Sequence, residues 1–162
     1  MRATGTSSRA SPASAVRRAA LTGEQHPVTR ICDLPSTLST LRGKVEFEVS
    51  EEGREQEVLE HLLRRATADT FRAHLGSADL SGLLATFEEG GTVETGDLVP
   101  ATDLLARVGE VPGLARLMTR LGMDGSESPG NAAAAVEFAL EGLYLMRRLS
   151  KDVLDGGAVY RT

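Results

Sequence analysis

Apolar residues recur at intervals of three and four along most of this chain, which is the spacing of one face of an α-helix. The clearest case covers about residues 51–75, where Leu59, Leu63, Phe71 and Leu75 lie on one row. Glycine and proline stand at the breaks between such runs, where they end and start helices. We therefore predict a mainly α fold, built from helices joined by short connections.

The predicted helices begin at capping residues or prolines and end at glycines. The last of them is apolar on two stripes, because Val136, Leu140 and Leu143 follow one line and Phe138 and Leu149 another. Such a helix is usually surrounded by others, so we expect an irregular antiparallel helical bundle. With their capping residues, the predicted helices span about 12–21, 33–43, 51–75, 77–90, 100–109, 112–122 and 131–154.

One short segment has the alternation of a β-strand. In residues 44–49, Val45, Phe47 and Val49 alternate with charged residues, which places the three apolar side chains on one face of an extended chain. A single strand needs a partner, and the stretch from Thr92 to Asp97 is assigned as a turn. The predicted fold class is thus mainly α with at most one short extended segment.

The length of 162 residues suffices for one hydrophobic core or for one part of a larger machine. Only 4% of the residues are aromatic, so the core must consist mainly of Leu, Val and Ala. We expect a disordered N-terminal segment at residues 1–10, which has no apolar run and therefore is not a secretory signal. Short helices and a linker are predicted at 11–43, and a helical C-terminal domain at 44–162.

Charge and composition narrow the range of partners. A net charge of −5 offers no general attraction for nucleic acid or anionic lipid, so neither is predicted as a partner. Only Lys44 and Lys151 among the 18 basic residues are lysines, a bias that indicates a GC-rich bacterial genome. The lone Cys32 cannot form an internal disulfide, and no apolar run could span a bilayer, so a cytoplasmic location without membrane contact is predicted.

No catalytic or metal-binding group is predicted. His61 and His74 are thirteen residues apart on one predicted helix, which leaves them roughly 220° apart around its axis. The glutamates between residues 46 and 60 lack the spacing of a calcium loop and suit the positive end of a helix dipole. Cys32 has no activating histidine near it in the sequence, so an inert, half-buried thiol is expected.

The sequence has none of the glycine-rich patterns that cradle phosphate: it contains no Gly-x-x-x-x-Gly-Lys-Ser/Thr, and no Gly-x-Gly-x-x-Gly follows a strand. Gly90 and Gly91 are assigned to a turn. Arg17 and Arg18, on the first predicted helix, have two interpretations. They could contact a nucleotide or an anionic partner, or they could form an ordinary solvated basic pair.

Several short sequence segments, or phrases, resemble the same protein family. The first reads Ala-Ser-Ala-Val-Arg-Arg-Ala-Ala-Leu-Thr-Gly-Glu at residues 13–24, and others lie at 30–34, 43–46, 52–55 and 138–145, with Lys151 beyond them. Over residues 13–154 these phrases resemble the C-terminal part of bacterial magnesium-chelatase I-subunit-like AAA+ ATPases. They are packing and capping phrases without a catalytic residue, so they indicate a lineage better than an activity.

The resemblance implies a role within a larger protein. In that family an N-terminal module carries the Walker motifs, and a C-terminal helical subdomain forms a lid over the nucleotide in a ring of subunits. ATP and Mg²⁺ are thus implied for the intact protein, with the nucleotide-binding module and the ring neighbours as partners. The family also places a nucleotide-sensing arginine just before the helix that residues 13–21 match, and Arg9 is the candidate for it.

Two function hypotheses follow. In the first, the chain is the helical part of an AAA+ ATPase that uses ATP to insert a metal into a tetrapyrrole or to remodel a protein, with the ATPase module preceding it or residing in another chain. In the second, the chain is a stand-alone helical protein-interaction module with no nucleotide role. Neither hypothesis gives these residues alone the ability to hydrolyse ATP.

Overall fold

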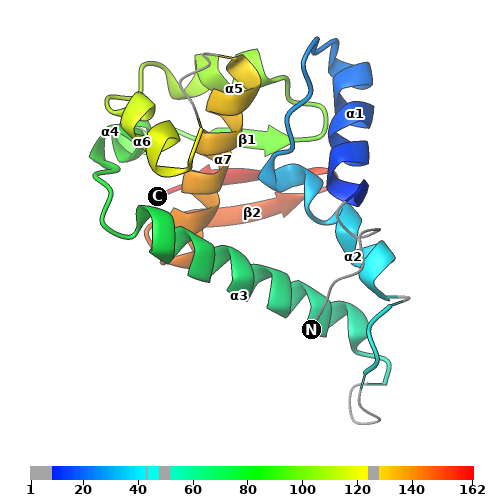
Figure 1. Cartoon of the computed structure of the whole chain (residues 1–162). Helices are drawn as coiled ribbons and strands as arrows, with labels where there is room; N and C mark the ends of the chain where they lie inside the picture. Colours follow the sequence, from blue (N-terminus) through cyan, green and yellow to red (C-terminus); the bar gives the residue numbers. More distant parts are fainter. Residues whose placement is uncertain (1–8, 43, 48–51, 124–127) are drawn as a thin grey trace.

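The computed structural model describes residues 9–42, 44–47, 52–123 and 128–162, apart from the side chain of Glu89 (Figure 1). Most of the described residues are helical, so the predicted mainly α class is confirmed, and a small antiparallel sheet forms its extended part. The helical elements are α1 (Ala10–Thr22), η2 (Ile31–Asp33), α2 (Ser36–Arg42), α3 (Glu55–Leu75), α4 (Ser81–Leu84), η4 (Ala85–Gly90), α5 (Ala101–Val108), α6 (Leu114–Arg120) and α7 (Pro129–Leu145). The strands are β1 (Val93–Gly96), β2 (Ser150–Leu154) and β3 (Gly157–Arg161).

Helix boundaries follow the local chemistry of the sequence. Helix α1 ends at Gly23, whose φ of 77° is a left-handed conformation that glycine adopts readily. Helix α7 begins at Pro129, two residues before the predicted start at 131, and the hydroxyl of its N-cap Ser128 accepts a hydrogen bond from the backbone N–H of Asn131 at 3.2 Å. Prolines thus stand at the starts of α5 and α7, as the sequence predicted.

The last predicted helix is too long by nine residues at its end: it was expected to reach Leu154, and α7 ends at Leu145. The chain then turns into a hairpin, in which β2 and β3 are joined by Asp155 and Gly156. Asp-Gly between two strand-forming runs is a strong hairpin signal, because Gly takes up positive φ without strain. Leu149 fitted a helical stripe with Phe138, which favoured a helix over the hairpin.

The sheet has the order β1-β3-β2, and both pairings are antiparallel. Strand β1 occupies residues that the sequence analysis assigned to a turn, so that assignment is wrong. In the segment expected at 44–49, Val45 and Phe47 are half-buried and Lys44 and Glu46 are exposed, as the alternation predicted, but residues 44–47 pair with no strand in the described part of the chain. Val49 lies outside the described residues.

The hydrophobic core surrounds α7, which Figure 1 shows between α5, α6 and the sheet, with α3 running along the lower side. Val136, Leu140 and Leu143 are all buried, as the stripes of the sequence predicted. Helices α1 and α2 lie at one end of the molecule, opposite α4 and α6. The buried residues of α1 are not part of this core cluster. The inner face of α1 instead contacts the rest of the chain through Arg18, which binds Glu24 and Asp33.

Candidate functional site: the exposed face of α1 and the charge network beneath it

Helix α1 has two faces of different chemistry. Ala15, Arg18 and Ala19 are buried on the side that packs on the rest of the chain. The opposite side is exposed, and Val16 and Leu21 keep 59% and 57% of their surface open to solvent. Because large apolar side chains are seldom left so open together on one short helix, this face is the first candidate for contact with another surface.

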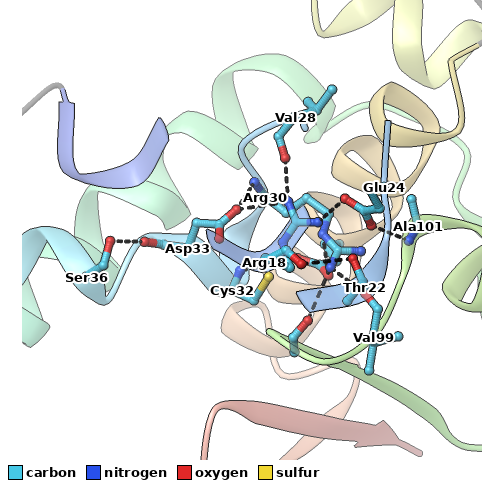
Figure 2. Close-up of polar contacts among 12 residues, drawn as sticks. Arg18, Thr22, Glu24, Val28, Arg30, Cys32, Asp33, Ser36, Val99 and Ala101 are labelled. Carbon is cyan, nitrogen blue, oxygen red and sulfur yellow. Dashed lines mark hydrogen bonds and ion pairs between the residues drawn. The ribbon is translucent and has the colours of Figure 1, made fainter. Parts of the chain in front are cut away.

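Arg18 fixes the inner face of α1 to the loop that follows the helix (Figure 2). Its guanidinium, which has no exposed surface, contacts the Glu24 carboxylate at 2.5 Å and the Asp33 carboxylate at 3.2 Å. It also donates a hydrogen bond to the Val28 carbonyl at 2.7 Å. A buried guanidinium with two carboxylate partners holds one orientation, so the rotation of α1 about its axis is set by charge as well as by packing.

Glu24 extends this contact to the helix that starts at Ala101. One oxygen of its carboxylate accepts from Arg18, and the other accepts the backbone N–H of Ala101 at 2.6 Å. The first N–H groups of a helix have no partner within the helix, and a carboxylate there also suits the helix dipole. Glu24 therefore caps α5 from a distant part of the chain and ties it to α1.

Arg30 and Glu137 carry the network into the centre of the molecule. The Arg30 guanidinium donates to the carbonyls of Gly96 and Val99 at 3.2 and 2.6 Å, and its Nε lies 3.5 Å from Oε1 of Glu137. The Arg30 backbone N–H donates to Asp33 at 2.9 Å. Both Arg30 and Glu137 are buried, so this ion pair joins the α1–α2 region to α7 without access to water.

Burial changes the proton affinities in this network. It raises the pKa of Glu137, although Arg30 and the Cys32 N–H bond oppose that rise. It also raises the pKa of the Cys32 thiol to about 12, an effect that Glu137 strengthens. Cys32 is half-buried, so the structure confirms the thiol's predicted placement, and its high pKa disfavours the reactive thiolate.

The three arginines proposed from the sequence have separate environments. Arg9 is exposed at the N-cap of α1, on the same row as Val16, because seven residues are close to two helical turns. Arg17 is exposed and pairs with Asp97 at 2.9 Å. Arg18 lies inside the network, so within this fold its guanidinium is engaged internally and faces no surface.

A cleft of about 560 Å³ adjoins α1 on the side of Ser14 and Arg17. At its base, Oε2 of Glu141 accepts hydrogen bonds from Lys151 Nζ and from the Tyr160 hydroxyl, both at 2.6 Å. Sequence reasoning missed this cluster, because Lys151 and Tyr160 come from the hairpin that it did not predict. The Asp155-Gly156 turn was the signal that could have found it.

Within the described residues, no group of three or more His, Cys, Asp or Glu side chains has the arrangement of a metal site. No helix in the described part of the chain is long and apolar enough to cross a membrane. Comparisons with family models, with curated proteins and with solved structures found no match.

Proposed function

We propose that this chain is the C-terminal helical part of a magnesium-chelatase-like AAA+ ATPase and that α1 packs by its exposed face on the nucleotide-binding module. ATP hydrolysis in that module would drive metal insertion or the remodelling of a protein partner. The sequence phrases at 13–24 and 138–145 support the proposal. The observation that carries it is the apolar, solvent-facing side of α1.

The composition of that face suits a contact with protein. Pro12, Ala13 and Ala20 are exposed together with Val16 and Leu21. Arg9 lies on the Val16 row and Arg17 lies between Ala20 and Leu21 around the helix. Arginine is enriched at protein interfaces, where it stands among apolar side chains. The occupant we propose is the nucleotide-binding module, because a helical lid closes over a nucleotide only if it leans on that module.

The apolar face predicted for the extended segment at 44–49 is a second candidate for this contact. Val45 and Phe47 are half-buried there, and Val49 lies outside the described residues. Helix α1, whose N-cap is Arg9, exposes the larger apolar side chains of Val16 and Leu21.

ATP and Mg²⁺ belong to the other module in this proposal. A phosphate cradle needs a lysine free to reach the phosphates, and Lys151 is held by Glu141 while Lys44 is exposed next to the end of α2. Arg9 is the residue we propose to reach toward a nucleotide from the start of α1. The proposal places the protein in the cytoplasm of a bacterium, within a ring of subunits.

The contact can be tested with Val16→Asp. Val16 is exposed on a helix, so the substitution should leave the fold intact and change the free energy of unfolding by no more than about 0.5 kcal/mol. Binding to the isolated nucleotide-binding module of a magnesium-chelatase I-like protein should weaken roughly tenfold or more, because a carboxylate would be buried without a partner. Isothermal titration calorimetry measures the dissociation constant.

Leu62→Asp is the matched control, because Leu62 is 51% exposed on α3 and lies on no surface used in the proposal. It should bind the module as the unchanged chain does. If Val16→Asp also binds normally, or if the unchanged chain shows no affinity for such modules, α1 is not the contact face.

A further inference from the structure

Arg147 has a backbone conformation that its residue type disfavours. It follows α7 with φ of 59°, the only non-glycine residue with positive φ in the described part of the chain. Its N–H donates to the Tyr144 carbonyl and that of Arg148 to the Leu143 carbonyl, both at 2.8 Å. These bonds define the helix-ending motif in which glycine is the usual residue at this position. An arginine there costs stability, so its presence points to a use for its side chain.

The two consecutive arginines also lack partners. Arg147 and Arg148 are exposed, and neither makes an ion pair or a side-chain hydrogen bond with any described residue. Arg65, Arg107 and Arg161 each lie next to a carboxylate, whereas the exposed Arg9 and Arg116 also make no ion pair with a described residue. Among the described residues, therefore, no carboxylate neutralises these two adjacent guanidinium groups, although the net charge of the chain is −5.

Both arginines line one hollow. It has a volume of about 500 Å³ and lies beyond the end of α7. Its other lining residues are Tyr144, Leu149, Ser150, Lys151 and Thr162. The Lys151 ammonium is held by Glu141 at 2.6 Å and lies 5.5 Å from the centre of the Tyr144 ring, so its position is fixed. The positive charge that the hollow can offer an anion therefore comes from Arg147 and Arg148, because Glu141 offsets the charge of Lys151.

We propose that this hollow binds a small, multiply charged oxyanion of the phosphate class. The planar fork of a guanidinium matches two oxygens of such an anion. The guanidinium groups of Arg147 and Arg148 carry two positive charges, which is more than a ligand with a single carboxylate would neutralise. A phosphate or pyrophosphate group carries more negative charge and is therefore favoured. The site is separate from α1 and does not depend on the proposed function.

A second explanation of the two arginines has to be separated from this one. Cations near the C-terminal end of a helix stabilise the carbonyl end of its dipole. Under that explanation, Arg147 and Arg148 contribute only to stability, and the hollow has no ligand. The strained backbone allows the two explanations to be told apart, because glycine at position 147 removes the cation and relieves the strain together.

The test uses Arg147→Gly and titration of the ¹⁵N-labelled chain with pyrophosphate at constant ionic strength. For the unchanged chain we expect saturable shifts in the amide signals of residues 144–151, with a dissociation constant of roughly 1 mM. Arg147→Gly should raise the urea midpoint of unfolding and weaken binding at least about tenfold. Loss of binding in a more stable fold cannot come from structural damage.

Arg148→Gln should weaken pyrophosphate binding similarly, and Arg65→Gln on α3 should bind as the unchanged chain does. Separate titrations with inorganic phosphate and glycerol phosphate distinguish a free anion from a phosphate ester as the source of the group. The proposal is overturned if pyrophosphate shifts no signal in residues 144–151 beyond what sodium chloride does. It is equally overturned if Arg147→Gly and Arg148→Gln bind with unchanged affinity.

Discussion

The ring of Phe71 on α3 packs against the backbone of Gly142 on α7, in space that a side chain at position 142 would need. A Cβ built on Gly142 would overlap the ring itself. Phe71 is buried and lies at the centre of the contact between the two long helices. This contact explains why the phrase at 138–145 contains a glycine in the middle of a helix, where glycine is otherwise unfavourable.

Gly142→Ala is therefore expected to destabilise the fold although alanine favours helices. The cost should be about 1–3 kcal/mol or more, because the core must shift to admit the methyl group. Urea unfolding followed by circular dichroism measures it. Combining Gly142→Ala with Phe71→Leu should cost less than the sum of the two single changes, since the smaller side chain leaves room. Strict additivity would contradict the close packing of Phe71 on Gly142.

Leu143→Ala tests whether α7 is central. Leu143 is only 4% exposed, so its truncation should lower the free energy of unfolding by about 2–5 kcal/mol. The same truncation at the exposed Leu62 should cost much less, since little of that side chain is removed from water on folding. An unchanged melting curve for Leu143→Ala would mean that the helix is not buried.

Glu137 makes a predictable contribution to the dependence of stability on pH. Its pKa is raised on folding, so the stability linked to Glu137 is fully present below its ordinary pKa. That stability is then lost as the pH rises through the raised value. Relative to Glu137→Gln, the unchanged chain should thus become steadily less stable from about pH 4 upward.

The measurement for Glu137 is urea unfolding of both proteins between pH 4 and pH 8. Subtracting one free energy from the other removes the contribution of the carboxylates that the two proteins share. A difference that moves in favour of the unchanged chain as the pH rises would show that Arg30 outweighs burial. That result would mean that folding lowers the pKa of Glu137 instead of raising it.

Cys32 should react slowly in the folded protein. A pKa of about 12 for the thiol leaves roughly 1000-fold less thiolate at pH 8 than an unperturbed cysteine has. Alkylation by iodoacetamide at pH 8 should therefore be at least about 100-fold slower in the folded chain than in urea, as followed by mass spectrometry. Equal rates would indicate that the region around η2 opens freely.

Much of the helical part of the fold could be predicted from the sequence, because its boundaries depend on local chemistry. Gly23, Pro100 and Ser128 each act on their own helix, so their effects are visible without tertiary structure. The sheet could not be found in the same way. Thr92 to Asp97 contains residues typical of turns, and it becomes a strand because β3 supplies hydrogen bonds from a distant part of the chain.

The contrast between Arg17 and Arg18 shows where sequence reasoning about the site ends. The two side chains are adjacent and chemically identical, but they point about 100° apart around α1. One pairs with Asp97 at the surface, and the other is enclosed by Glu24 and Asp33. Which of them is buried depends on the positions of those carboxylates, and these are set by the loop that folds back on α1.

The steady-state rate of ATP hydrolysis tests the central claim most directly. The purified chain should show no turnover above background, and joining it to a nucleotide-binding half from a magnesium-chelatase I-like protein should give Mg²⁺-dependent turnover. Arg9→Ala in the joined protein should lower that rate at least about tenfold without changing the unfolding midpoint, because Arg9 is exposed. Robust Mg²⁺-dependent hydrolysis by these residues alone, or turnover of the joined protein no higher than that of the nucleotide-binding half by itself, would contradict the account.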